Sequence, residues 1–196
     1  MIVPAIIVSS LIVFWGVSLL NAVKHRGTEA GRDSEENPLS PMFTVALFGT
    51  IFMFAEALVF SYLGIFGTNA VIFGTLFTPS GALSLLGALV FSSGCFLHAW
   101  SVRVRGRHAV SWAMPEDHRV IVKPPYSLVR HPSYLGYILM IVGMTISWGN
   151  VVTLVPWVAI PGYYFVSLYE ESMLIERFGE EYREYMKRVN GFIPRI

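Results

Sequence analysis

Residues 131–169 decide the fold. They read HPSYLGYILMIVGMTISWGNVVTLVPWVAIPGYYFVSLY and contain no Asp, Glu, Lys or Arg. A helix needs about 20 consecutive apolar residues to cross the hydrocarbon core of a bilayer, so this stretch is long enough for two passes. Gly149 and Asn150, near its middle, are turn-forming residues. We therefore expect two antiparallel membrane helices, over residues 132–148 and 151–169, joined by a tight turn.

The rest of the chain contains further uncharged blocks at residues 1–23 and 57–102. Hydrophobic residues make up 54% of the 196 positions and charged residues only 14%, whereas soluble domains carry about 25% charged residues. The first block lacks the positive flank and the small-residue cleavage site of a secretory signal. The sequence thus predicts an all-α integral membrane protein, a single membrane domain over residues 1–196. Its five transmembrane helices are expected at about 2–23, 42–66, 81–102, 132–148 and 151–169.

The basic residues predict the orientation of these spans. With five spans, all of them fall in the loop after the first span, the loop after the third span and the C-terminal tail, while the two opposite connections contain none. Because Lys and Arg accumulate in cytoplasmic loops, we expect the N-terminus outside and the C-terminus in the cytoplasm. The fourteen basic residues are Lys24, Arg26, Arg32, Arg103, Arg105, Arg107, Arg119, Lys123, Arg130, Arg177, Arg183, Lys187, Arg188 and Arg195.

The segment after the last span is charged but has one apolar face. Residues 170–190 place apolar side chains three and four positions apart, which is typical of an amphipathic helix. We expect this segment to be a C-terminal interfacial helix. The apolar positions are Leu174, Phe178, Tyr182, Tyr185, Met186 and Val189.

The predicted hairpin brings chemically useful side chains together. Its first helix begins after Arg130 and His131, and its second helix ends before Glu170 and Glu171. Two antiparallel helices of similar length place these ends side by side. Free N–H groups at a helix start also form an anion site. The structural alternatives are that Arg130 is an interface anchor, that His131 is a helix cap and that the glutamates open a solvated helix.

Other polar or small residues inside the spans have two interpretations. Glu56 is the only acidic residue within a span, and an intramembrane carboxylate is a functional candidate because it is costly to bury. His98, near the end of the third span, is a candidate partner for it. Gly136 and Gly143 lie seven residues apart on one helix face and allow close approach of a ligand or of a neighbouring helix. The single cysteine, Cys95, excludes an intrachain disulfide and a cysteine-based metal cluster.

The C-terminal part resembles the isoprenylcysteine carboxyl methyltransferase family and its phospholipid methyltransferase relatives, including short prokaryotic members with five spans. The resemblance covers about 80 of 196 residues, from His118 to the C-terminus. The matching motifs are specific when they are taken together, although each fragment alone would be weak. The residues that carry it are His118, Tyr126, RHPSYLG at 130–136, Glu170, Glu171, Leu174, FGEEY at 178–182, Tyr185 and FIP at 192–194.

The resemblance implies an S-adenosylmethionine-dependent methyltransferase whose cofactor-binding part is residues 103–196. It implies catalytic roles for Arg130, Glu170 and Glu171. The lipid acceptor would enter laterally from the membrane, and the active site would face the cytoplasm. The cofactor-binding residues that it implies are His118, Val122, Lys123, Tyr126, His131, Tyr134, Gly136 and Glu170. Candidate substrate-binding residues are Glu56 and His98.

The acceptor stays open at this point. Residues 163–169 carry no charge, although a basic residue there would be a natural partner for a substrate carboxylate. An isoprenylcysteine carboxylate, a phospholipid amine and a quinone-like hydroxyl are the alternatives. Competing functions are an NADPH-dependent membrane reductase of the sterol type, which has a similar Arg-His-Pro-x-Tyr pattern, and a non-enzymatic membrane partner. We find no motif for a metal or for nucleic acid.

Overall fold

The computed structural model describes residues 2–24, 41–66, 74–106 and 119–195. Within these ranges the chain is helical apart from turns, short loops and one isolated bridge between Thr75 and Asn150. The elements are, in chain order, α1 (Ile2–Lys24), α2 (Pro41–Ile65), α3 (Gly81–Arg105), α4 (Pro132–Trp148), the 3₁₀ helix η3 (Val151–Val158), α5 (Ala159–Phe178) and α6 (Glu180–Arg188).

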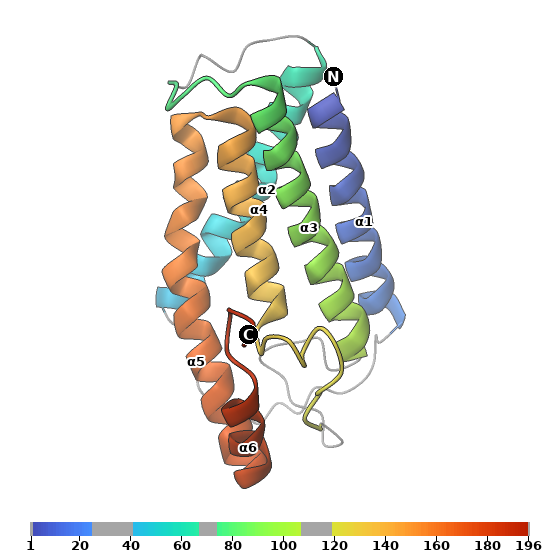
Figure 1. The fold of residues 1–196 in the computed structure, drawn as a ribbon, viewed down its shortest axis with the longest axis vertical. Coiled ribbons are helices and arrows are strands. Elements are labelled where there is room, and N and C mark those ends of the chain that lie inside the picture. The colour runs from blue at the N-terminus through green and yellow to red at the C-terminus, as the bar shows by residue number, and fades with distance from the viewer. Residues whose placement is uncertain (1, 25–40, 67–73, 107–118, 196) are drawn as a thin grey trace.

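The long helices form an up-and-down bundle (Figure 1). The helices α1, α3 and α5 run from the end of the bundle where the N-terminus lies to the opposite end, and α4 runs back between α3 and α5. The helix α3 packs against α4 and α1, and α2 packs against α5 and η3. The last turn of α3, the first turn of α4 and all of α6 therefore lie at the same end of the bundle (Figure 1).

In the described part of the chain, four helical segments are long and apolar enough to cross a membrane: α1, α2, α3 and the continuous segment Val151–Phe178. The helix α4 is also apolar but has 17 residues, which corresponds to about 26 Å at 1.5 Å per residue. The chain is thus a multi-pass membrane protein. The number of five spans and the orientation of the termini stay predictions.

The turn between α4 and α5 follows from its two turn residues. Gly149 adopts a left-handed conformation with φ of 55° and ends α4. The side chain of Asn150 then accepts a hydrogen bond from the backbone N–H of Val152 at 2.9 Å. The predicted antiparallel hairpin is confirmed, with one difference: the second arm begins as the 3₁₀ helix η3, which contains Pro156.

The prediction of one amphipathic helix over residues 170–190 is wrong. The helix α5 continues through Phe178, and Gly179, with φ of 56°, separates it from α6. A positive φ is readily adopted only by glycine, so the chain changes direction at this residue. Tyr182 and Tyr185 of α6 are buried together with Val189, and residues of α5 and α6 pack on them. The apolar face that the sequence shows is therefore divided between two helices that pack on each other.

Glycines set the distance between α3 and α4. A Cβ atom added to Gly136 would lie 2.8 Å from the carbonyl oxygen of Gly94, and one added to Gly87 would lie 2.6 Å from that of Gly143. Both distances are shorter than van der Waals contact, so the two backbones touch. Close approach through small residues is characteristic of membrane helix pairs. It brings the last turns of α3 next to the first turns of α4, where the candidate site lies.

Candidate active site

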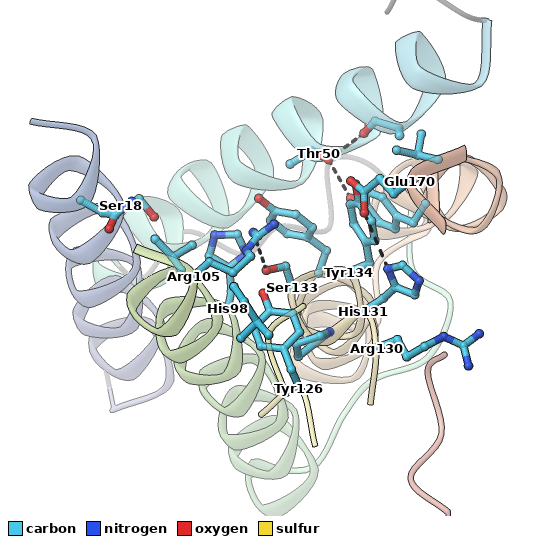
Figure 2. A pocket seen from close by; sticks show the side chains of 18 of the residues that line it. Ser18, Thr50, His98, Arg105, Tyr126, Arg130, His131, Ser133, Tyr134 and Glu170 are labelled. Carbon is cyan, nitrogen blue, oxygen red and sulfur yellow. Dashed lines mark hydrogen bonds and ion pairs between the residues drawn. The ribbon is translucent and has the colours of Figure 1, made fainter. Parts of the chain in front are cut away.

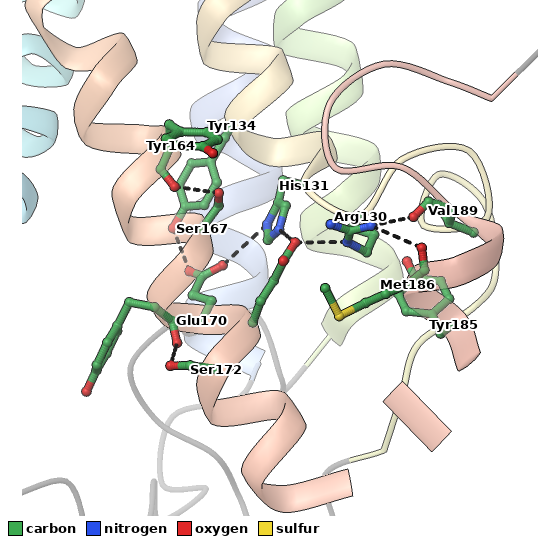
Figure 3. A network of polar contacts seen from close by, with 12 residues as sticks. Arg130, His131, Tyr134, Tyr164, Ser167, Glu170, Ser172, Tyr185, Met186 and Val189 are labelled. Carbon is green, nitrogen blue, oxygen red and sulfur yellow. Dashed lines mark hydrogen bonds and ion pairs between the residues drawn. The ribbon is translucent and has the colours of Figure 1, made fainter. Parts of the chain in front are cut away.

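The start of α4 and the second half of α5 are joined by a buried polar cluster (Figure 3). Oε1 of Glu171 lies 2.6 Å from Nε2 of His131 and accepts a hydrogen bond of 2.8 Å from Nε of Arg130. The hydroxyl of Tyr134 donates to Oε1 of Glu170, and Oε2 of Glu170 lies 3.7 Å from Nδ1 of His131. The predicted meeting of these five side chains is confirmed.

The C-terminal tail holds Arg130 in place (Figure 3). Nη1 of Arg130 donates to the carbonyl oxygen of Val189 at 2.6 Å. The backbone N–H groups of Arg130 and His131 donate to the carbonyl oxygens of Asn190 and Gly191 at 2.8 and 3.0 Å. The guanidinium thus contacts Glu171 and the backbone carbonyls of Met186 and Val189. A catalytic role for Arg130, and likewise for Glu170 and Glu171, stays a prediction.

The protonation of His131 is controlled by its two acidic neighbours. Burial lowers the pKa of His131, but the contacts with Glu170 and Glu171 and their negative charges outweigh burial, so the pKa is raised above its usual value. An imidazolium between two carboxylates is stabilised by both. The cluster of Arg130, His131, Glu170 and Glu171 therefore contains two cations and two anions when His131 is protonated.

A cavity of about 820 Å³ lies beside this cluster (Figure 2). Its volume is within the range of about 300–1,000 Å³ that small-molecule sites occupy. All five long helices contribute to its wall, together with residues 119–121 and Tyr126 of the loop that precedes α4. One part of the wall is polar and includes His131, Tyr134 and Glu170.

The part of the wall that α1 and α2 form is apolar and reaches the outside of the bundle. Trp15, Leu47 and Ile51 line the cavity, yet their side chains are 54%, 47% and 61% exposed. In a membrane such side chains face lipid. Phe14 and Phe54 continue the apolar wall inward, with ring centroids 5.0 Å apart. The cavity thus connects a polar cluster with an apolar outer surface of the spanning helices.

The predicted cofactor residues differ in where the structure places them. Tyr126, His131, Tyr134 and Glu170 line the cavity. Val122 and Lys123 are exposed, and neither is among the residues that line it. His118 lies outside the described residues. Gly136 packs against Gly94 of α3 and is not among the cavity residues. Direct contact of any of these residues with a cofactor stays a prediction.

The two substrate candidates inside the spans do not pair with each other. Glu56 is buried, and both of its carboxylate oxygens lack a hydrogen-bond partner among the described residues. It is not among the residues that line the cavity. His98 does line the cavity, and its ring stacks on Phe14 with centroids 4.4 Å apart. The predicted Glu56–His98 partnership is therefore wrong, and a substrate role for Glu56 stays a prediction.

In the sequence, Arg105 is only one of the basic residues at the end of a predicted span. In the structure its side chain lines the cavity, and its Nη2 donates a hydrogen bond of 3.1 Å to Oγ of Ser133 (Figure 2). The signal that could have found it is helical spacing, because His98 and Arg105 are seven residues apart and thus share a helix face. Among the described residues, no group of three or more His, Cys, Asp or Glu side chains is arranged to hold a metal.

The fold and the site define a class: a helical membrane protein with a small-molecule cavity that is polar at one end of the bundle and open to lipid. A model of the phospholipid methyltransferase family matches residues 83–181, which is more than half of the chain and includes α3, α4 and α5. The chain belongs to the phospholipid methyltransferase family.

Two individual relatives are protein-S-isoprenylcysteine O-methyltransferases. The chain is 27% identical over 117 residues to protein-S-isoprenylcysteine O-methyltransferase B of Arabidopsis thaliana, which covers 57% of this chain and 59% of that protein. It is 32% identical over 91 residues to the corresponding enzyme of Schizosaccharomyces pombe, covering 45% and 39% of the two chains. The chain thus spans about three fifths of the length of the first of these relatives.

A solved structure has a similar fold. It is that of the eukaryotic intramembrane Ras methyltransferase, an isoprenylcysteine carboxyl methyltransferase. The superposition has a TM-score of 0.54 with 26% sequence identity, and it covers 89% of this chain and 60% of that one. The likeness therefore includes almost the whole bundle and not only the matched C-terminal part.

Proposed function

We propose that this protein transfers a methyl group from S-adenosylmethionine to a lipidated acceptor that enters the cavity from the bilayer. The observation that carries the proposal is the cavity itself, because one continuous space joins the buried cluster at His131, Tyr134 and Glu170 to the lipid-exposed wall at Trp15 and Ile51. A water-soluble methyl donor and an apolar acceptor need such a meeting place. Membership of the family and the methyltransferase relatives support the same chemistry.

The residues present fit the methyl donor. Its sulfonium and ammonium groups are positive, and Glu170 contributes a carboxylate to the cavity wall, while Glu171 lies buried directly behind His131. Tyr126, His131 and Tyr134 would line the part of the cavity that holds the adenosine and amino acid parts. When bound, S-adenosylmethionine supplies a methyl group on a positive sulfur, which leaves as a neutral thioether once the methyl group is transferred.

The chain itself supplies alignment and exclusion of water. The hydrogen bonds from Tyr134 to Glu170 and from Arg130 to Glu171 fix the two carboxylates before any ligand binds. Preorganised groups lose little freedom when the reactants bind, and holding two reactants in line can contribute several kcal/mol to the rate. The apolar wall formed by Phe14, Trp15 and Phe54 would hold the lipid chain of the acceptor and keep water out.

The test is calorimetric binding of S-adenosylhomocysteine to the detergent-solubilised protein, with NADPH measured in parallel. We expect saturable binding of S-adenosylhomocysteine that is weakened about tenfold or more in Glu170→Gln, because a hydrogen bond to a charged group contributes about 1.5–3 kcal/mol. Glu176→Gln is the matched control, since Glu176 is an exposed residue of the same helix. Binding of NADPH without binding of S-adenosylhomocysteine would overturn the proposal in favour of a reductase.

A further inference from the structure

Arg105 is a cation in the cavity wall that forms no ion pair with any described residue. Its Nη2 donates to Ser133, and its Nε is buried with no hydrogen-bond partner in the part of the chain that the structure describes. No carboxylate of the described residues lies within salt-bridge distance of it. Leaving a buried charge uncompensated costs several kcal/mol. A protein that keeps such a group in a ligand-sized cavity therefore has a use for its charge.

Two other polar groups beside Arg105 also lack partners. The hydroxyl of Tyr126 and Nδ1 of His98 are both buried without a hydrogen bond among the described residues. Burial raises the pKa of Tyr126, and although the charge of Arg105 opposes this effect, the phenol stays protonated and able to donate. Nδ1 of His98 donates in the tautomer that carries its proton there. His98, Arg105 and Tyr126 all line the same cavity and lie on its α3 side (Figure 2). Unsatisfied buried polar groups that converge on one space beside a cation indicate an acceptor that is bound there.

Glu170 does not fill this role. Its charge reaches Arg105, but one of its oxygens accepts from Tyr134 and the other faces His131. The acidic cluster and Arg105 thus occupy different sides of the cavity (Figure 2). The site has an anionic side, formed by the second half of α5, and a cationic side, where α3 ends.

The cationic side adjoins the apolar wall. The ring of His98 packs on Phe14 and lies 4.7 Å from the ring of Tyr137, centroid to centroid. Ser18 and Asn21, one and two turns beyond Phe14 on α1, also line the cavity. A lipid chain held against Phe14 and Trp15 would therefore place a polar head group near Arg105.

We propose that Arg105, assisted by Tyr126 and His98, binds the carboxylate of the acceptor and so selects an acid-bearing lipid over an amine-bearing one. This inference rests on the proposed function. Residues 163–169 of α5 carry no cation, and Arg105 supplies one from α3. An amine acceptor, which is positive before it reacts, would be repelled from the same position.

The chemistry balances without a general base. A carboxylate oxygen forms the new C–O bond to the methyl carbon, the C–S bond breaks with its electron pair going to sulfur, and the products are a methyl ester and a neutral thioether. No proton is released. The role of Arg105 is therefore to hold and orient an anion, which a guanidinium does through several parallel N–H donors.

The experiment measures binding of N-acetyl-S-farnesylcysteine and of its methyl ester to the detergent-solubilised protein without cofactor. The two probes share the lipid chain and differ in the negative charge. We expect the wild-type protein to bind the acid at least tenfold more tightly than the ester. Arg105→Met should remove this preference by weakening acid binding, while the affinities for the ester and for S-adenosylhomocysteine stay within about twofold, since a charged hydrogen bond contributes about 1.5–3 kcal/mol.

Two further variants test whether the acid preference depends on the position and on the shape of the cation. Arg103→Met is the matched control, because Arg103 is an exposed residue of the same helix, and it should keep the acid preference. Arg105→Lys keeps the charge but loses the planar array of donors, and it should give an intermediate preference. Unchanged ester binding shows that each variant is folded, and Arg105→Lys replaces Arg105→Met if the latter does not fold.

Three outcomes would overturn the inference. They are persistence of the acid preference in Arg105→Met, absence of that preference in the wild-type protein, and a tenfold loss of S-adenosylhomocysteine binding with acid binding intact. The last outcome would assign Arg105 to the carboxylate of the cofactor. Failure of the wild-type protein to bind S-adenosylhomocysteine would instead contradict the proposed function, so the two failures are distinguishable.

Discussion

Oε1 of Glu171 lies 2.6 Å from Nε2 of His131, so the second half of α5 is joined to the start of α4. The same oxygen accepts a hydrogen bond from Arg130, whose guanidinium also binds a backbone carbonyl of the C-terminal tail. One carboxylate thus connects three separate segments of the chain. Both side chains of the Glu171–His131 pair are largely buried, at 8% and 5% exposure.

Removal of the Glu171 charge should destabilise the protein. In Glu171→Gln, Arg130 and His131 lose their shared anion in a buried place, and breaking one partner of a buried pair costs about 3–5 kcal/mol. We expect the free energy of unfolding in detergent to fall by about 3 kcal/mol. Glu176→Gln, on the exposed face of α5, should change it little. Equal stability of the two variants would show that the cluster does not hold the segments together.

Stability should also depend on the protonation of His131. Its pKa is raised in the folded protein above the value of about 6.5 expected in an unfolded chain. The protonated form therefore stabilises the fold fully below about pH 6.5, and this contribution is lost as the pH rises through the raised folded-state pKa. Thermal unfolding measured from about pH 6 to about pH 9 should show a decline in Tm.

The matched variant for this pH series is His131→Gln. It cannot be protonated, so its Tm should be lower at about pH 6 but should fall less as the pH rises to about 9. A wild-type decline that persists in full in His131→Gln would assign the pH dependence to other groups.

The meeting of Arg130 and His131 with Glu170 and Glu171 could be predicted from the sequence, because it follows from the lengths of two apolar stretches and from the turn between them. Two apolar stretches of similar length joined at Gly149 must bring Arg130 and His131 back to Glu170 and Glu171. The structure confirms this arrangement through its hydrogen bonds. No knowledge of side-chain packing was needed for this part of the site.

Arg105 could not be assigned in the same way. A basic residue at the end of a membrane helix commonly extends toward water, and the sequence pattern does not distinguish this from an inward direction. The direction is set by the rotation of α3 about its axis. That rotation depends on the contact of Gly94 with Gly136, which involves two helices separated by a long loop.

The helix boundary at Gly179 was missed for a related reason. The apolar spacing of residues 170–190 is continuous across it, and periodicity alone predicts one helix. The positive φ of Gly179 is stabilised by the packing of Tyr182 and Tyr185 against residues of α5, and such packing appears only once the helices are in place.

The α3–α4 contact should not tolerate a methyl group. In Gly136→Ala the new Cβ would lie 2.8 Å from the carbonyl oxygen of Gly94, so the helices must separate and both the Arg105 and the His131 sides of the cavity must shift. We expect a lower Tm and weaker S-adenosylhomocysteine binding. Gly16→Ala in α1 is the control, because no atom lies within 4 Å of its new Cβ and alanine favours the helix by up to about 1 kcal/mol. Equal Tm values for the two variants would contradict the close contact.

The orientation in the membrane can be tested with single cysteines, because the natural Cys95 is buried, at 1% exposure, and should not react with a membrane-impermeant maleimide. Thr78→Cys lies in an exposed loop at the N-terminal end of the bundle, and Glu184→Cys lies on the exposed face of α6 at the other end. Since the basic residues that the structure describes lie toward the α6 end of the bundle, that end should face the cytoplasm. Intact cells should therefore label Thr78→Cys, whereas Glu184→Cys should require permeabilisation.

The wild-type protein should stay unlabelled in both conditions. Labelling of Glu184→Cys in intact cells would reverse the orientation and would place the entrance for the methyl donor on the outer side of the membrane.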